Sequence, residues 1–319
     1  MMSYNWYDHY GHAANAESRY NTAVSTLDFT EYSQVAGAEV PERSLRTQGM
    51  QIGGRTRLLP SQGADVTKTG KWRNSLSWYD DKGRVIYGAT VDSANSSLLI
   101  HTQYSGTQYH FSYGTLVNKQ MLINGNADDG YTSHTELQHY QYDAFTGRLQ
   151  QISHKLDNAN WAVIASYAYD GMGRMRRKDL GLGGEIQEFD YNIRGELTGI
   201  NGHYAETGYK AGAKRSFGES LKYDYGFDKV RYDGSVSGVV WRGSSGSTGP
   251  TIGHAYGYDY DRSGRVLEAD YNQQVKNGLS IIPWNKTSSD YTVSNLSYDL
   301  NGNLTPVEFK EKRKVNCLV

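Results

Sequence analysis

The feature that most limits the fold of this chain is a short pattern that recurs along it. The pattern is an aromatic residue, Asp, two or three variable residues, Gly and then an apolar run. It is clearest at residues 258–267, where alternating aromatic residues end at Asp261 and Gly264 leads into the second run. Asp at the start of a type I turn accepts backbone hydrogen bonds, and a Gly three residues later adopts the left-handed conformation that lets two strands re-pair. Each copy therefore predicts a β-hairpin.

The pattern occurs at intervals that indicate a repeat architecture. Degenerate candidates at residues 109–114 and 223–226 fill the gaps between clearer copies. The turn positions 80, 110, 143, 170, 192, 224, 261 and 299 are then 22 to 38 residues apart, a period typical of repeat proteins. The residues of the six better copies are Tyr79, Asp80, Gly83 and Arg84; Tyr142, Asp143, Gly147 and Arg148; Tyr169, Asp170, Gly173 and Arg174; Tyr191 and Gly195; Tyr260, Asp261, Gly264 and Arg265; and Tyr298, Asp299 and Gly302.

At these residues the chain resembles the RHS-repeat or YD-repeat family, whose signature is Tyr-Asp, two or three variable residues and Gly-Arg-Leu/Val. The resemblance is closest to long surface-associated members in Bacteroidetes-type bacteria and covers roughly residues 30 to 305. It implies a β-sheet that spirals into a large hollow shell, which in some members encloses a toxin polypeptide. Family members usually continue into a core region with autoproteolytic aspartates, which has no counterpart in this sequence.

We therefore expect an all-β fold of repeated β-hairpins forming a large twisted antiparallel sheet, an open array that is part of a spiralling shell. The chain has 27 tyrosines and 36 glycines but only 5 prolines. This composition suits many short strands joined by turns. The predicted organisation is a lead-in segment over 1–70, the repeat array over 71–305 and a polar tail over 306–319, with a flexible Gly/Ser loop at 243–250. Within each hairpin we expect the Arg after the turn to pair with the Tyr before it, stabilising by about 0.2 to 1 kcal/mol.

Composition argues against several classes of function. The formal net charge of -1 gives no broad positive field, so no nucleic-acid partner is expected. Cys317 is the single cysteine, which rules out an intrachain disulfide. No apolar run reaches the roughly 18 residues of a membrane span, and the polar start lacks an apolar signal core. If the parent protein is secreted or held at the cell surface, we expect its signal upstream of this segment.

Possible metal and catalytic residues have simpler interpretations. His134, Glu136 and His139 depart from the His-Glu-x-x-His zinc pattern and lie in a strand-like context. Residues 124–130 gather oxygen ligands, but Thr135 stands where a calcium loop needs Glu. The repeat aspartates are explained by their place at turns. We expect no catalytic residues, no metal, no cofactor and no enzymatic activity.

The leading hypothesis is a non-catalytic structural segment of a repeat shell that encloses or presents a C-terminal toxin or effector. Its partners would be the remaining repeats of the parent chain and an enclosed toxin polypeptide. The alternative is a cell-surface carbohydrate- or protein-binding β-module that stacks sugar rings of a surface glycan on its tryptophans; a hydrolase is the weakest hypothesis. An open array has two unpaired edges, so we also expect poor solubility or self-association unless neighbouring repeats continue the sheet. The tryptophans are Trp6, Trp72, Trp78, Trp161, Trp241 and Trp284.

Overall fold

The structure is a computed structural model. It describes residues 3–13, 15–57, 72–95, 98–124, 133–209, 214–224, 227, 229–244, 251–277, 280–281 and 291–305. The chain divides into two compact units, Met1–Ser166 and Tyr167–Val319. The expected loop at 243–250 is described only for Gly243 and Ser244, and the expected tail at 306–319 lies outside the described residues.

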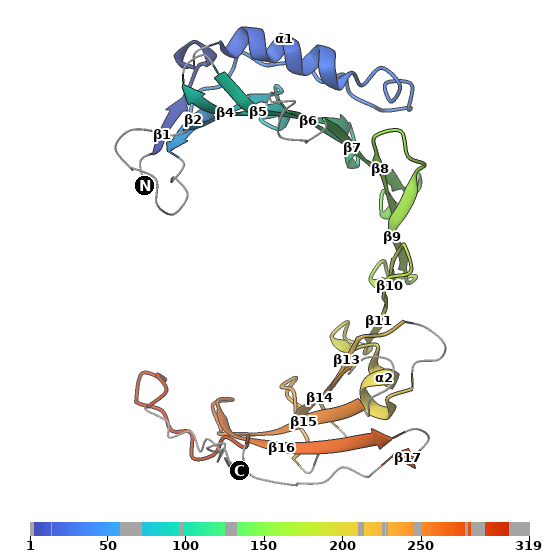
Figure 1. The fold of residues 1–319 in the computed structure, drawn as a ribbon. Helices are drawn as coiled ribbons and strands as arrows, with labels where there is room; N and C mark the ends of the chain where they lie inside the picture. The colour runs from blue at the N-terminus through green and yellow to red at the C-terminus, as the bar shows by residue number, and fades with distance from the viewer. Residues whose placement is uncertain are drawn as a thin grey trace, which may run out of the picture. The chain divides into compact units, whose positions relative to one another are not determined.

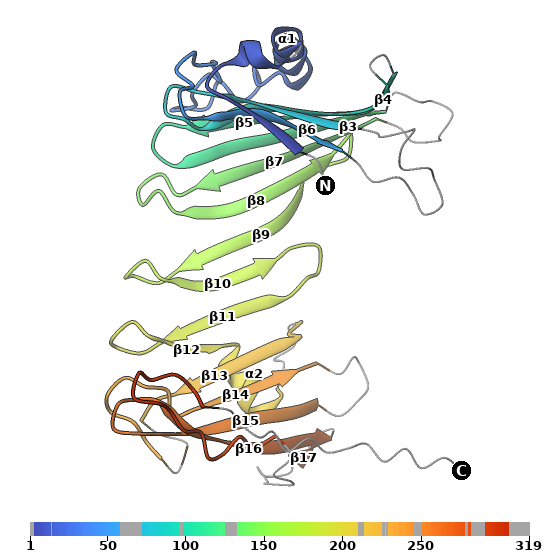
Figure 2. The same ribbon diagram turned by 90° about the vertical axis from the view of Figure 1, so that its left-hand side faces the viewer.

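The first unit is a series of antiparallel strands with one helix against a face of the sheet (Figures 1 and 2). Each described strand of this unit pairs with its neighbours in sequence, from β1–β2 to β8–β9, and no pairing of β1 with a later strand closes the sheet among the described residues. The elements are β1 (Ser3–Tyr7), the 3-10 helix η1 (Tyr10–His12), α1 (Ala16–Leu27), β2 (Gln51–Arg57), β3 (Trp72–Tyr79), β4 (Val85–Asn95), β5 (Leu98–His110), β6 (Gly114–Asn124), β7 (His134–Tyr142), β8 (Leu149–Leu156) and β9 (Ala162–Tyr169), which runs into the second unit.

The second unit continues the same meander of hairpins and also leaves its sheet open among the described strands. Its elements are β10 (Met175–Leu180), β11 (Ile186–Tyr191), β12 (Leu197–Ile200), α2 (Gly202–Thr207), β13 (Phe217–Lys222), β14 (Gly238–Gly243), β15 (Thr251–Tyr260), β16 (Val266–Asn277) and β17 (Ser280–Ile281). The predicted all-β class, built from antiparallel hairpins, is confirmed. Among the described residues, no helix is long and apolar enough to cross a membrane.

Most hairpins carry the same irregularity just before the turn. The register shifts by one residue before Tyr79 in β3, before Tyr142 in β7 and before Tyr260 in β15. Such a β-bulge re-aims the side chain that follows it and increases the local twist. The repeat tyrosine therefore leaves the regular two-residue alternation of its strand.

Helix α1 covers one face of the first sheet and supplies the largest core. Its buried residues Ala16, Ala23 and Leu27 are spaced so that they share one face of the helix. They join a cluster in which Trp78 is fully buried and Tyr87 nearly so. Because this face offers small side chains and one Leu, the aromatic residues of the sheet supply most of the apolar surface.

The segment that carries α1 is an insertion in the turn of the first hairpin. β1 and β2 pair as one hairpin, and the backbone N–H of Asp8 donates to the carbonyl of Met50 (3.1 Å). The same bond closes the short turn between β3 and β4, from Asp80 to Arg84 (2.9 Å). Residues 9–49 thus replace the few turn residues of the other repeats. The predicted lead-in segment contributes two strands to the sheet, besides covering it.

In the second unit, Asn201 fixes the short helix α2 against the sheet. Asn201 lies in the left-handed region (φ 49°) and is 3% exposed. Its Oδ1 accepts from the backbone N–H of Glu188 (3.0 Å), and its Nδ2 donates to the carbonyl of Phe217 (2.9 Å). A buried side-chain amide with both ends bonded ties β11, α2 and β13 together.

Replacing Leu27 with Ala tests the helix packing. Leu27 has no exposed surface, so we expect Leu27→Ala to lower the free energy of unfolding of the first unit by about 2 to 5 kcal/mol. Val24 on the same helix is 37% exposed, and Val24→Ala serves as the control, with an expected change within about 0.5 kcal/mol. Urea unfolding followed by tryptophan fluorescence measures both; equal effects would contradict the packing described.

Candidate functional site: the repeat turns

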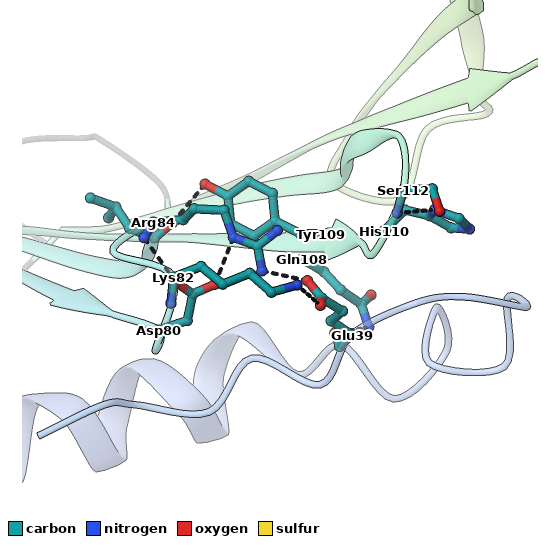
Figure 3. Close-up of polar contacts among 9 residues, drawn as sticks. Glu39, Asp80, Lys82, Arg84, Gln108, Tyr109, His110 and Ser112 are labelled. Carbon is teal, nitrogen blue, oxygen red and sulfur yellow. Dashed lines mark hydrogen bonds and ion pairs between the residues drawn. The ribbon is translucent and has the colours of Figure 1, made fainter. Parts of the chain in front are cut away.

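The turn between β3 and β4 shows how one Asp organises a hairpin (Figure 3). Oδ1 of Asp80 accepts from the backbone N–H groups of Lys82 (2.9 Å) and Arg84 (2.8 Å). Its Oδ2 accepts from Nε of Arg84 (2.7 Å). Gly83 has φ 77°, which only Gly adopts without strain. The carboxylate therefore fixes both the turn and the guanidinium that follows it.

Two turns of the second unit reproduce this arrangement. Oδ1 of Asp170 accepts from the Arg174 N–H at 2.9 Å and its Oδ2 from Arg174 Nε at 2.7 Å. For Asp261 and Arg265 the same two distances are 2.9 Å and 2.6 Å. Gly173 and Gly264 between them have φ 87° and 77°.

Two further Asp copies keep the turn but give the carboxylate other hydrogen-bond partners. Asp143, in the longer turn ending at Gly147 and Arg148, accepts at Oδ1 from the Thr146 N–H (2.7 Å). Asp299, in the turn with Gly302, accepts from Asn303 Nδ2 (2.9 Å), because Asn303 stands where other repeats have Arg.

One copy has no carboxylate at the first turn position. Asn192, in the turn with Gly195, accepts at Oδ1 from the N–H groups of Arg194 and Glu196, both at 3.0 Å. An amide oxygen thus suffices for the turn itself.

In seven hairpins the repeat tyrosine is bonded to the hairpin before it. Its hydroxyl donates to the backbone carbonyl at the start of the second strand of the preceding hairpin. Tyr169 stands at the same position, at the end of β9. The pairs are Tyr79 with Gln51 (2.6 Å), Tyr109 with Val85 (3.0 Å), Tyr142 with Thr115 (2.8 Å), Tyr191 with Met175 (2.9 Å), Tyr223 with Leu197 (3.1 Å), Tyr260 with Val236 (2.6 Å) and Tyr298 with Val266 (2.7 Å).

The repeat arginine contacts a different tyrosine from the one expected. Within its hairpin Tyr79 lies opposite Val85, so Arg84 is not its cross-strand partner. Arg84 instead stacks on Tyr109 of the next hairpin, 4.2 Å from the ring centroid. The expected pairing within one hairpin is wrong because the bulge shifts the register by one residue. Two further repeats show the same stacking, Arg174 on Tyr191 and Arg265 on Tyr298, both at 4.7 Å.

The sequence analysis did not predict the contacts of Glu39 with the turn between β3 and β4. Glu39 lies in the inserted segment and forms ion pairs with Lys82 and Arg84, and its backbone carbonyl accepts from Gln108 (Figure 3). The side-chain bond from Lys82, followed by that from Arg84, lowers the pKa of Glu39. The signal for the insertion was in the sequence, because Trp6-Tyr7-Asp8 repeats Trp78-Tyr79-Asp80.

The turn carboxylates are held in their charged form. Backbone bonds from Arg174 and Arg265 lower the pKa values of Asp170 and Asp261. Side-chain bonds from Thr146 and Asn303 lower those of Asp143 and Asp299. Each of these aspartates has hydrogen-bond partners within its own turn, which is a structural arrangement.

The histidines considered as metal ligands do not come together. His134 pairs with Asp157 (2.9 Å), and Glu136 lies 3.3 Å from His154. His139 follows at an odd spacing, on the other face of β7, where its ring lies 5.8 Å from that of Tyr32. Within the described ranges no cluster of three or more His, Cys, Asp or Glu could hold a metal. Most of the calcium-loop candidate, residues 125–130, lies outside the described residues.

A surface cavity of about 500 Å³ lies beside α2, and its lining includes Arg177, Glu188, His203 and Arg215. Glu188 accepts from Arg215 (2.5 Å) and lies 3.7 Å from Arg177. Glu188 therefore offsets part of the positive charge that Arg177 and Arg215 bring to the cavity.

Of the tryptophans considered for glycan stacking, Trp284 lies outside the described residues. The three below are in the core or beside other rings. Trp78 is in the core. The ring of Trp241 packs nearly parallel to His254 (5.3 Å) and Tyr256 (5.5 Å). Trp161 is 41% exposed and has the ring of His139 at 6.2 Å. A sugar on Trp241 would have to share its indole with two neighbouring rings.

Comparison with known proteins gives no family assignment. No family model matches the chain, and no curated protein is detectably similar to it. Similar solved structures include TcdB2-TccC3-Cdc42 (13% identity, TM-score 0.26, 83% of this chain) and TcdB2-TccC3 (13%, 0.27, 84%). A Photorhabdus luminescens Tc holotoxin pore with a TccC3 mutation is also similar (13%, 0.27, 84%). The matches cover 18% to 19% of those chains. At these TM-scores they carry no argument about function.

Removing one connecting hydroxyl tests its contribution. Tyr191→Phe keeps the ring beside Arg174 but leaves the carbonyl of Met175 without its donor, so we expect a loss of about 0.5 to 1.5 kcal/mol in the free energy of unfolding. Tyr232 is 77% exposed, and Tyr232→Phe is the matched control, with an expected change near zero. Urea unfolding measures both, and an unchanged midpoint for Tyr191→Phe would show that this bond adds nothing.

Acid should weaken the turns. A carboxylate whose pKa is lowered by folding stabilises the protein above its unfolded pKa of about 4, and this stabilisation is lost as the pH falls through the folded pKa. We therefore expect the urea midpoint to fall from about pH 4 downward. Asp170→Asn, which copies the Asn192 turn of this same chain, should keep the turn and reduce this pH dependence. An Asp170→Asn variant with the same pH profile as the parent would contradict the assignment.

Proposed function

We propose that this chain is a non-catalytic structural segment of an RHS/YD-repeat shell. The observation that carries the proposal is the use made of the repeat residues. The Asp and Gly form each turn, while the Tyr and Arg contact the neighbouring hairpin. The repeated residues therefore serve to hold successive hairpins together. The wall of a shell needs such contacts between successive hairpins, and this role agrees with the resemblance of the repeats to that family.

The shell would enclose or present a toxin or effector polypeptide encoded at the C-terminal end of the parent protein. That parent would be secreted or held at the cell surface, with its export signal outside this segment. The remaining repeats of the parent chain would be the immediate partners of the array. What supports this part is the family resemblance together with an antiparallel sheet whose described strands leave it open for further strands.

The test is to determine the gene sequence on both sides of this segment and to co-express the chain with the polypeptide encoded downstream. We expect further repeats and a variable end downstream, co-purification, and protection of the downstream polypeptide from protease. A downstream polypeptide that is digested equally fast with and without the array would contradict enclosure. Turnover of esterase, glycosidase or peptidase substrates, abolished by a single substitution, would contradict a non-catalytic role.

A further inference from the structure

The cavity beside α2 contains a carboxylate that takes no part in the contacts among the described residues. Asp190 lines this cavity and is exposed. No described residue donates a hydrogen bond to Asp190 or forms an ion pair with it. The space beside it is open because it lies opposite Gly199 in β12, and a Cβ placed on Gly202 would still be 3.7 Å from its Oδ2. Asp190 is therefore available to a ligand.

A guanidinium with unused donors lies on the same face of the sheet. Arg177 in β10 pairs with Glu188 in β11, and Asp190 follows Glu188 by two residues, so the three side chains share one face. An arginine carries five N–H donors. The described residues bond only one of them in Arg177, to Asp179 (3.0 Å), while Glu188 lies 3.7 Å away. Arg215 adds a second guanidinium to the lining, with only 9% of its side chain exposed.

The wall of the cavity adds an aromatic surface. Tyr209 is 57% exposed, and its ring meets that of His203 edge to face, with 6.0 Å between the centroids. Both rings line the cavity, whose volume of about 500 Å³ is in the range of sites for small molecules. The cavity thus offers donors, a carboxylate and a ring surface within one unit of the chain.

The separation of the two charged groups restricts the ligand. Arg177 and Asp190 are diagonal neighbours of an antiparallel pair, and residues so placed are about 7 to 8 Å apart. They form no ion pair with each other. A simple anion would be repelled by Asp190 and Glu188, and a simple cation by the two arginines. A small molecule that carries both charges can meet each group with its opposite.

We propose that this cavity binds a free α-amino acid. Its carboxylate accepts hydrogen bonds from Arg177, its ammonium group donates to Asp190, and its side chain packs on the ring of Tyr209. An α-amino acid fits because it carries both charges on one carbon, whereas either end of a peptide carries only one. The structural role of the repeats does not depend on this site, so each proposal can fail without the other.

Calorimetric titration of the 319-residue chain with three related compounds tests the assignment. L-Phenylalanine carries both charges, N-acetyl-L-phenylalanine lacks the ammonium group, and L-phenylalanine amide lacks the carboxylate. Each of the two modified compounds should bind about 10-fold or more weakly than L-phenylalanine, because it leaves one charged group of the cavity without its partner. Equal affinity for all three compounds would overturn the proposal.

Two variants assign the charges to their residues. Asp190→Asn should weaken the binding of L-phenylalanine about 10-fold but leave that of the N-acetyl compound unchanged. Arg177→Gln should weaken L-phenylalanine to a similar extent but leave the amide unchanged. Asp224→Asn and Arg194→Gln change exposed residues outside this cavity and are the matched controls, which should bind as the parent chain does.

The fold of the variants is checked separately. Asp190 is exposed, and 43% of the Arg177 side chain is exposed, so neither substitution should shift the urea midpoint. Folded variants that bind L-phenylalanine as tightly as the parent chain would contradict the assigned contacts. A parent chain that binds none of the standard amino acids would overturn the proposal altogether.

Discussion

The bond from a tyrosine hydroxyl to a carbonyl of the preceding hairpin is the interaction on which the repeat structure depends. The backbone hydrogen bonds of a sheet pair neighbouring strands, but they do not depend on side chains and so do not specify which hairpin follows. The tyrosine adds a side-chain bond at a fixed place, next to the turn, and the bulge before it aims the ring there. The arginine of the preceding turn stacks on that same ring at Tyr109, Tyr191 and Tyr298. Arg231 lies over Tyr260 in a similar way. One tyrosine thus donates a hydrogen bond through its hydroxyl and contacts a cation with its ring.

This arrangement makes the energetics of the array local. Each turn is stabilised by its own Asp or Asn, and each junction by a Tyr and, where present, an Arg. Stability is then close to a sum of turn terms and nearest-neighbour terms, as in other repeat proteins. Junctions differ accordingly: the one after Arg84 has a tyrosine bond and a stacked arginine, whereas for the one after Glu196 the described residues give only the tyrosine bond. The helices α1 and α2 add non-local cores, one in each unit.

The sequence was sufficient for what is decided within a few residues. An Asp and a Gly three residues apart predict a turn because every bond involved closes within the turn, and the all-β class followed from many such turns. Partners in other hairpins were out of reach. The Arg84 contact was assigned to the wrong tyrosine because a bulge of one residue changes which side chains meet. Helix α1 lies in the lead-in segment, and the sequence does not single it out because its buried face has only Ala16, Ala23 and Leu27. Its function as a cover depends on the aromatic residues of β3 and β4.

The first hairpin shows how much extra chain one turn can carry. Asp8 closes the neck with Met50 by the same backbone bond that closes the short turns, and residues 9–49 fold above it without altering the register of β1 and β2. The entropic cost of closing a loop grows only with the logarithm of its length, so each doubling of the loop costs about 0.6 kcal/mol more. The turns of this repeat are therefore suitable places for the insertion of additional chain segments. A wall made of them can gain a foreign surface feature at any hairpin while its strands stay as they were.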